Sequence, residues 1–190
     1  MTLDIGTGDG LFVYRSARCN PTRFFVGIDP NTRPLQKISQ KIYRKPAKGG
    51  APNALFIQAS VENLPKELNG IANEVHVHFP WGSLLRAVAL GELNELEAIR
   101  GVCTSNAVLK LTIGLDEQRD TSEINRLGLQ SLSPDFLRHQ LHERYLAARF
   151  EIIEYTCIPP VNWPGLETSW AKRLQGGHTR KITYLLARAI

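Results

Sequence analysis

Near the start of the chain, three glycines alternate with other residues in the stretch Asp4-Ile5-Gly6-Thr7-Gly8-Asp9-Gly10. Apolar residues precede and follow this stretch, which predicts a strand, a glycine loop and a helix in succession. Such a loop at the edge of a parallel sheet presents backbone N–H groups to a nucleotide-like ligand, and glycine lets the backbone approach it closely. The stretch therefore predicts a nucleoside cofactor site that includes Gly6, Thr7 and Gly8.

Acidic residues follow the ends of the first three expected strands. Asp4 lies just before the glycines, Asp29 follows the second strand, and Glu62 comes a few residues past the third. We expect Asp4 to meet a cofactor ammonium group and Asp29, with Pro30 beside it, to bind the ribose. Glu62 is expected to accept a hydrogen bond from an adenine amino group while Val61 packs on the ring.

Acids in these three places suit a cofactor with an ammonium and a sulfonium group better than one with a pyrophosphate. The glycine spacing is G-x-G-x-G, whereas nicotinamide sites usually have G-x-G-x-x-G. We therefore expect S-adenosylmethionine, with S-adenosylhomocysteine as its product, and no metal ion. The alternative interpretation is that the acids are turn and cap residues, and a nicotinamide oxidoreductase is the least favoured class.

The elements that must position these residues alternate between strands and helices. Apolar periodicity predicts strands at residues 1–5, 24–28, 54–58, 74–78, 107–113, 150–157 and 182–189. Helices are expected at residues 11–19, from about 29–32 to Pro46, at 84–100 with a possible break at Gly91, and at 134–148. This pattern predicts an α/β fold in one domain over residues 1–190. The sheet is expected to be Rossmann-like, seven-stranded and mostly parallel, with an antiparallel hairpin at one edge.

Composition and charge indicate the class of partner. A hydrophobic content of 43% and a charged content of 22% are ordinary for a soluble globular protein, and no apolar run is long enough to span a bilayer. The three cysteines are widely spaced and suggest neither a metal cluster nor a disulfide framework, so a cytoplasmic location is expected. Residues 31–50 carry a net charge of +6 and residues 165–190 carry +4, on a total of +5. Two basic segments on a mildly acidic body predict a polyanionic partner.

Two tryptophans lie in loop-like contexts. The stretch after the fourth strand contains Phe79, Pro80 and Trp81, at the edge of the sheet where the cofactor is expected. Trp170 lies among small, polar and basic residues. Two such side chains could clamp an extruded base, because every base has a π face. The alternative is that one or both cap the end of the sheet.

Taken in order, the motifs resemble the aminoglycoside-resistance 16S rRNA methyltransferases that modify N1 of the decoding-site adenine at position 1408, the Kam and Npm group. The glycine loop is common to very many methyltransferases, whereas the two tryptophan motifs and the Lys-Pro-Ala-Lys-Gly-Gly loop are far more discriminating. The motifs extend from residue 3 to about residue 180, and they are Asp4-Ile5-Gly6-Thr7-Gly8-Asp9-Gly10, Gly27-Ile28-Asp29-Pro30, Lys45-Pro46-Ala47-Lys48-Gly49-Gly50, Phe79-Pro80-Trp81-Gly82-Ser83-Leu84-Leu85 and Glu167-Thr168-Ser169-Trp170-Ala171-Lys172-Arg173-Leu174.

The resemblance implies a class I methyltransferase fold and transfer of a methyl group from S-adenosylmethionine to adenine 1408 of 16S rRNA in the 30S subunit. It implies a cytoplasmic monomer that confers aminoglycoside resistance and does not bind membranes. Adenine N1 has a free lone pair and no proton, so catalysis by positioning is expected, without a general base. A tRNA (guanine-N7) methyltransferase is the nearest alternative. An RNA-docking module that binds the cofactor without catalysis is another.

The resemblance also implies roles for individual residues. Trp81 and Trp170 would stack on the flipped adenine, with Phe79 and Pro80 forming the floor of the pocket. The backbone at His78 would lie near the methyl group. Residues implied near the cofactor or the target are Ser83 and Thr168. Cations implied to bind rRNA are Arg44, Lys45, Lys48, Arg126, Arg173 and Arg180. Relatives also carry an N-terminal extension, expected as a β-hairpin, ahead of the strand in which this sequence begins.

Overall fold

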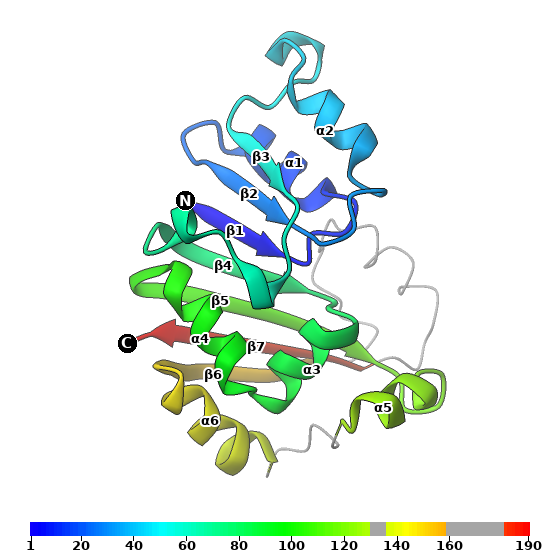
Figure 1. Cartoon of the computed structure of the whole chain (residues 1–190), viewed down its shortest axis with the longest axis vertical. Helices are drawn as coiled ribbons and strands as arrows, with labels where there is room; N and C mark the ends of the chain where they lie inside the picture. Colours follow the sequence, from blue (N-terminus) through cyan, green and yellow to red (C-terminus); the bar gives the residue numbers. More distant parts are fainter. Residues whose placement is uncertain (130–135, 159–180) are drawn as a thin grey trace.

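A single mixed sheet of seven strands, in the order β3-β2-β1-β4-β5-β7-β6, organises the described part of the chain (Figure 1). The structure is a computed structural model that describes residues 1–129, 136–158 and 181–190. Strands β1 to β5 pair in parallel, whereas β7 runs antiparallel to both β5 and β6. The strands are β1 (Thr2–Ile5), β2 (Phe25–Ile28), β3 (Ala54–Ile57), β4 (Ala72–His78), β5 (Cys103–Leu115), β6 (Phe150–Ile158) and β7 (Lys181–Ala189). The predicted fold class is confirmed, including the antiparallel hairpin at the β6 edge.

Helices cover both faces of the sheet, and each face has its own apolar core. Side chains alternate across a strand, so Phe25 of β2 packs on one face while Val26 and Ile28 pack on the other. The smaller core lies under α1 (Leu11–Cys19) and α2 (Gln36–Ile42), and the larger lies under α3 (Gly82–Leu90), α4 (Leu93–Val102) and α6 (His142–Ala147). The other helical segments are η1 (Pro46–Lys48), η2 (Val61–Asn63), η3 (Lys66–Leu68), α5 (Thr121–Leu127) and the π-helical η4 (Phe136–Leu141).

Several element boundaries differ from the prediction. The helix expected from residues 29–32 begins only at Gln36, because the carboxylate of Asp29 caps a turn through the amide of Asn31. The expected break at Gly91 is present, with φ at 69°, and separates α3 from α4. Helix α5 was not predicted, since residues 115–133 show no clear apolar period. Among the described residues, no helix combines the length and apolarity needed to cross a bilayer.

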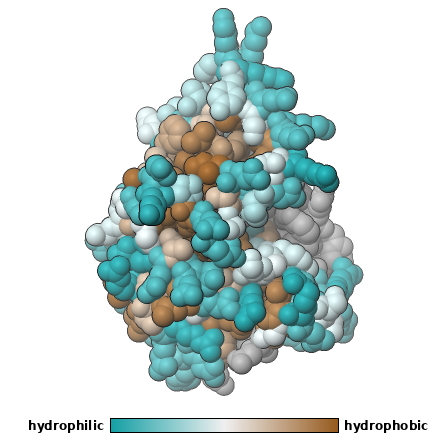
Figure 2. Space-filling view, viewed as in Figure 1, coloured by the Kyte–Doolittle hydropathy of each residue, from teal (hydrophilic) through white to brown (hydrophobic). Residues whose placement is uncertain are grey.

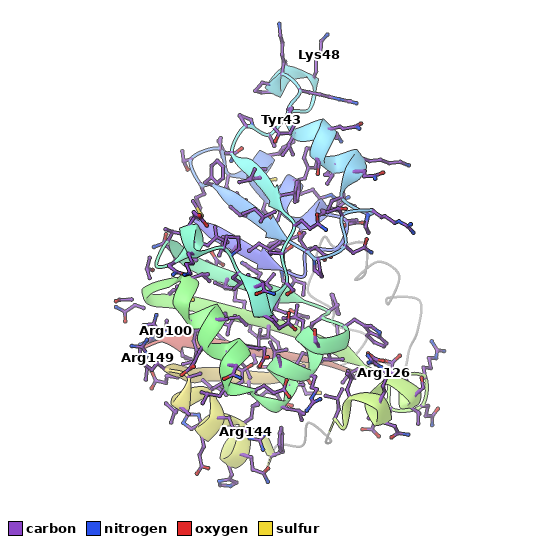
Figure 3. The ribbon with its side chains drawn as sticks, viewed as in Figure 1. Tyr43, Lys48, Arg100, Arg126, Arg144 and Arg149 are labelled. Carbon is purple, nitrogen blue, oxygen red and sulfur yellow. The ribbon has the colours of Figure 1, made fainter. Side chains whose placement is uncertain are left out.

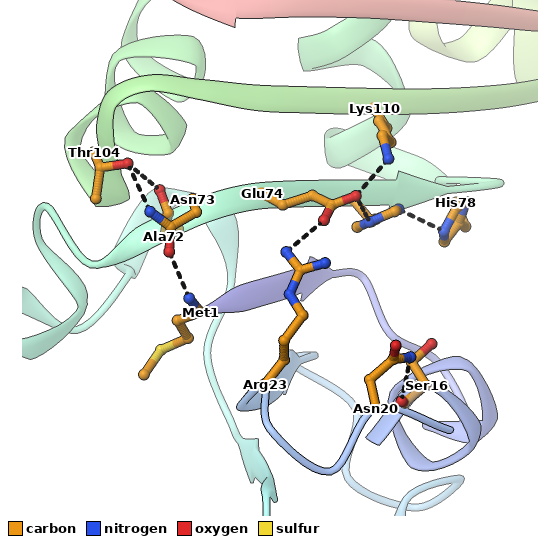
Figure 4. A network of polar contacts seen from close by, with 11 residues as sticks. Met1, Ser16, Asn20, Arg23, Ala72, Asn73, Glu74, His78, Thr104 and Lys110 are labelled. Carbon is orange, nitrogen blue, oxygen red and sulfur yellow. Dashed lines mark hydrogen bonds and ion pairs between the residues drawn. The ribbon is translucent and has the colours of Figure 1, made fainter. Parts of the chain in front are cut away.

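A polar array runs across the sheet beneath α1 (Figure 4). The carboxylate of Glu74 on β4 accepts hydrogen bonds from Lys110 on β5, from Nε2 of His76 at 3.0 Å and from Arg23 at 2.9 Å. Nδ1 of His76 and Nε2 of His78 share a further hydrogen bond at 3.1 Å. These contacts hold the pKa of Glu74 far below its usual value, with the hydrogen bond from His76 as the largest cause. The array therefore ties β4 to β5 and to the turn before β2.

We expect the Glu74→Ala substitution to lower the free energy of unfolding by about 2 kcal/mol, because it leaves a lysine, an arginine and a histidine without their shared acceptor. Glu74→Gln should cost less, since the amide oxygen still accepts. Urea denaturation at pH 7 measures both, with Glu97→Ala on the exposed face of α4 as the control. Equal effects of Glu74→Ala and Glu97→Ala would contradict a stabilising array.

Candidate functional site

A cavity of about 260 Å³ opens at the carboxyl ends of β1, β2 and β4, where the strand order reverses direction. Residues that sequence reasoning assigned to the cofactor and to the base line this single cavity. They are Asp4, Gly6, Thr7, Gly8, Asp29, Pro30, Val61, Glu62, His78, Phe79, Pro80, Trp81 and Ser83. Four segments far apart in the sequence, one after each of β1, β2, β3 and β4, thus meet in one place. Thr168 and Trp170 lie outside the described residues.

Asp4 is the most perturbed acid of the cavity. It lies near the end of β1 between two paired strands, so only 2% of it is exposed. The hydroxyl of Thr7 donates to Oδ2 at 2.6 Å, whereas the buried Oδ1 has no hydrogen-bond partner. Burial raises the pKa of Asp4 to about 7; the bond from Thr7 opposes this, while Asp29 and Asp9 add to it. A buried acceptor without a partner fits a positively charged donor that arrives with a ligand.

The glycine loop is held to the end of β2 by Asp29. One oxygen of the Asp29 carboxylate accepts from the amide of Gly8 at 2.8 Å, and the other accepts from the amide of Asn31 at 2.8 Å. The loop ends at Gly10, the N-cap residue of α1, with φ at 71°. A Cβ at this position would lie 2.6 Å from the ring of Phe56. Glycine is therefore required there by both the backbone angle and the space.

Glu62 lies at the opposite wall and remains ionised. Its pKa is held below the usual range mainly by a hydrogen bond from the hydroxyl of Ser60, with a smaller contribution from Ser83. Ser60 precedes η2 and Ser83 lies in the first turn of α3, so Glu62 joins the segment after β3 to the segment after β4. The carboxylate is exposed and can accept a further donor.

His78 brings the polar array of Figure 4 to the wall of the cavity. Burial, with smaller electrostatic contributions from His76 and Lys110, lowers its pKa to about 3. The ring of Phe12 packs against both imidazoles, with centroids 4.8 Å from His76 and 4.6 Å from His78. His78 is therefore neutral at physiological pH and adds no positive charge to the cavity.

The segment after β4 turns sharply into the cavity. Phe79 is 9% exposed and has a φ of 48°, a left-handed angle that is uncommon for a non-glycine residue. Trp81 follows with 51% of its surface exposed. An exposed indole at the mouth of a cavity, next to a buried phenyl and a buried proline, provides a flat surface on which an aromatic ligand can stack.

The charges around the cavity favour a cationic ligand. The described lining residues include Asp4, Asp9, Asp29 and Glu62, and no lysine or arginine among them. A pyrophosphate would find no positive partner on these walls, whereas an ammonium or sulfonium group would find several carboxylates. The donor set thus fits S-adenosylmethionine better than a dinucleotide.

The predicted RNA-binding cations fall in different places. Arg44, Lys45 and Lys48 are exposed around η1, at the tip of the molecule (Figure 3). Arg126 lies on α5, far from that tip, and makes a bidentate pair with Glu123 at 2.7 and 2.8 Å. Arg173 and Arg180 lie outside the described residues.

Sequence reasoning gave no site role to six residues that line the cavity, namely Ile5, Asp9, Phe12, Ala59, Ser60 and Leu84. Phe12 lies one turn into α1, and its apolar type predicted only core packing. Ser60 and Leu84 had no distinguishing spacing. Their neighbours Val61 and Ser83 were predicted, so adjacency to those residues was the only available signal.

The strand order, the glycine loop and the acid-lined cavity define a class I methyltransferase. Solved structures agree in fold over nearly the whole chain. The aminoglycoside resistance methyltransferase NpmB1 is 40% identical, with a TM-score of 0.85, and the match covers 100% of this chain and 86% of that one. A mutant of the 16S rRNA (adenine(1408)-N(1))-methyltransferase from Catenulisporales acidiphilia, crystallised with its cosubstrate SAM, is 35% identical. Its TM-score is 0.89, and the match covers 100% of this chain and 85% of that one.

Sequence comparisons identify the family. The model of the NpmA family, 16S rRNA (adenine(1408)-N(1))-methyltransferase, matches residues 1–189. Proteins of that description from Streptoalloteichus tenebrarius and Escherichia coli are 38% and 34% identical over 181 residues, which is 95% of this chain and 82% and 83% of theirs. The chain belongs to the 16S rRNA (adenine(1408)-N(1))-methyltransferase family. The predicted resemblance is thereby confirmed, and a tRNA (guanine-N7) methyltransferase is not favoured.

The raised pKa of Asp4 predicts a pH dependence of stability. The folded protein retains the Asp4 proton up to about pH 7, whereas an unfolded chain releases it near 3.8, so this group's contribution to stability falls as the pH rises between these values. We expect Asp4→Asn to be more stable than the parent at pH 8 by about 2–4 kcal/mol and similar to it near pH 4. Urea unfolding at the two pH values measures the difference. If the two proteins keep the same stability difference at both pH values, Asp4 does not titrate as described.

Proposed function

We propose that the protein transfers the methyl group of S-adenosylmethionine to N1 of adenine 1408 in 16S rRNA, within the 30S subunit. The observation that carries this proposal is the single cavity in which acids suited to the cofactor face the exposed indole of Trp81. The methyl group would place a fixed positive charge on the base edge that aminoglycosides contact, which accounts for resistance. The same proposal includes a cytoplasmic location and action as a monomer.

The cofactor would be held by residues at three strand ends. The unpartnered Oδ1 of Asp4 would accept from its ammonium group, and Asp29 would bind the ribose hydroxyls beside Pro30. Glu62 would accept from the adenine amino group, with the buried side chain of Val61 against the ring. Gly6, Thr7 and Gly8 form the turn that these groups surround. S-adenosylmethionine supplies an electrophilic methyl group, so neutral His78 and ionised Glu62 suit its positive charge.

The acceptor base would be held by aromatic surfaces. Trp81 would stack on one face of the flipped adenine, over a floor made by Phe79 and Pro80, and Trp170 would stack on the other face. Adenine N1 carries no proton, so these residues need only position the base and exclude water. Positive charge that develops on the base would be stabilised by the indole faces, by about 0.5–2 kcal/mol.

Basic residues would dock the enzyme on the ribosomal RNA. Arg44, Lys45 and Lys48 are exposed in and beside η1, Lys48 lies at the tip of the molecule (Figure 3), and hydrophilic side chains dominate that end of the surface (Figure 2). Arg126, with Arg173 and Arg180 of the basic C-terminal region, would contact phosphates nearer the flipped nucleotide.

The test is methylation of purified 30S subunits followed by primer extension along 16S rRNA. We expect a cofactor-dependent stop at adenine 1408, because N1 methylation blocks base pairing. Trp81→Ala should lose this stop, with at least a hundredfold fall in rate, while S-adenosylmethionine still binds by calorimetry.

Two results would contradict the proposal. A stop at another nucleotide, or methylation of free tRNA but not of 30S subunits, would assign a different target. Loss of both activity and cofactor binding in Trp81→Ala would indicate that the indole supports the fold of the cavity and does not hold the base.

The docking role of the tip predicts a salt dependence. Lys45→Glu with Lys48→Glu should weaken binding to 30S subunits by at least tenfold at low salt, because two phosphate contacts are replaced by repulsion. Filter binding over a range of salt concentrations should also show a shallower slope than that of the parent. Unchanged affinity would show that the tip faces away from the RNA.

A further inference from the structure

The basic tip is a compact loop built on one face of α1. We call residues 43–50, between α2 and the turn into β3, the apical loop. Within it the amide of Lys48 donates to the carbonyl of Lys45 at 2.7 Å, and the amide of Gly49 donates to that of Pro46 at 3.0 Å. The amide of Gly50 also donates to the carbonyl of Lys45, at 3.1 Å. The backbone therefore folds over itself in a tight turn.

Two side chains of α1 hold this loop from behind. The hydroxyl of Tyr14 donates to the carbonyl of Gly49 at 2.8 Å. The guanidinium of Arg18, one helical turn further on, donates to the carbonyls of Pro46 at 3.2 Å and Gly50 at 3.4 Å. Three carbonyls of the loop, those of Pro46, Gly49 and Gly50, thus receive donors from one helix. Arg18 is itself exposed, and one nitrogen of its guanidinium makes both bonds to the loop backbone.

The close packing leaves little freedom in the loop. A Cβ at Gly50 would lie 1.6 Å from the carbonyl oxygen of Arg44, so no other residue fits without moving the backbone. The ring of Tyr14 is 8% exposed and belongs to the core under α1 and α2. The ammonium of Lys41 lies over this ring, 4.4 Å from its centroid. Tyr14 thereby fixes the apical loop to the core under α1 and α2.

The outward side of the loop carries its charge. Arg44, Lys45 and Lys48 are all exposed, as is Tyr43, which keeps 80% of its surface accessible. Figure 3 shows Lys48 at the extreme end of the molecule with Tyr43 below it. Residues 31–50 contain no acid that could neutralise these cations. The braced backbone therefore presents three cations and one aromatic ring in a fixed arrangement.

We propose that Tyr14 and Arg18 are positioning residues for RNA docking. They hold the apical loop in its binding shape before it meets the phosphate backbone of the rRNA, so that little conformational entropy is lost on binding. The inference rests on the proposed function, because it assumes that the loop docks on rRNA. It assigns affinity to two α1 side chains that bind the loop backbone.

The salt dependence of binding distinguishes a residue that only supports the loop, which we call a brace, from one that contacts phosphate directly. A residue that binds a phosphate releases counterions, so its loss lowers the slope of log Kd against log salt by about 1. A residue that only shapes the loop leaves the number of phosphate contacts in the complex unchanged. Its loss should weaken affinity at every salt concentration and leave the slope as it was.

The test uses substitutions that preserve charge and ring. Tyr14→Phe removes only the hydroxyl that binds Gly49 and keeps the ring under Lys41. Arg18→Lys keeps the positive charge but not the planar guanidinium, one nitrogen of which reaches two carbonyls. Tyr155→Phe and Arg33→Lys are the matched controls, since both positions lie outside the apical loop and neither is buried. Lys45→Ala and Lys48→Ala serve as direct-contact variants.

We expect the double variant Tyr14→Phe, Arg18→Lys to bind 30S subunits about tenfold more weakly, with the slope of the parent. Its affinity for S-adenosylmethionine should not change, which shows that the fold is retained. Amide hydrogen exchange at Lys48, Gly49 and Gly50 should be faster than in the parent. The controls should bind as the parent does, and each direct-contact variant should reduce the slope.

Two outcomes separate the inference from the function on which it rests. Parent-like affinity of the double variant, together with weak binding by Lys45→Ala and Lys48→Ala, would overturn the brace and leave the docking role intact. Parent-like affinity of all these variants would remove the docking role itself. A reduced slope in the double variant would show that Arg18 contacts phosphate directly, which also overturns the brace.

Discussion

The burial of one carboxyl group, that of Asp4, is the constraint on which the site depends. Asp4 lies near the end of the interior strand β1, and paired strands on both sides remove it from water. Burial raises the pKa of Asp4 to about 7, and the hydrogen bond from Thr7 offsets only part of this rise. A group of this kind is tolerated where a ligand supplies its missing partner. Asp29 instead accepts hydrogen bonds from two backbone amides, and the hydrogen bond from the hydroxyl of Ser60 holds the pKa of Glu62 below its usual value.

Helix α1 connects the two functional ends of the molecule. It starts at Gly10, where the glycine loop leaves the cavity, and its Arg18 reaches the apical loop. Its nine residues span about 13 Å. Between these ends, Phe12 packs on the histidines of β4 and Tyr14 packs in the core beside α2. The cavity and the proposed docking loop thus lie at opposite ends of one helix.

The local parts of the site were predictable because their signals are local. Glycines at alternate positions, an acid at each strand end and a tryptophan after Phe-Pro are short patterns with a direct physical reason. Strand order follows from the alternation of apolar segments, because short crossovers leave few topologies. The helix at α5 escaped prediction because its seven residues include few apolar side chains. Phe12 and Ser60 escaped because nothing in their neighbourhood distinguishes a cavity wall from ordinary packing.

The sequence by itself determined the class of fold, the nature of the cofactor, the family and the presence of a basic segment without acids. These depend on residue types and short spacings, which are visible in the sequence without any tertiary contact. Tertiary structure alone decided that Asp4 keeps its proton to about pH 7, that His78 is neutral and that Tyr14 and Arg18 meet the apical loop. Burial by the folded chain and hydrogen bonds such as that from Tyr14 to Gly49, 35 positions away, set these properties, and no local pattern encodes them.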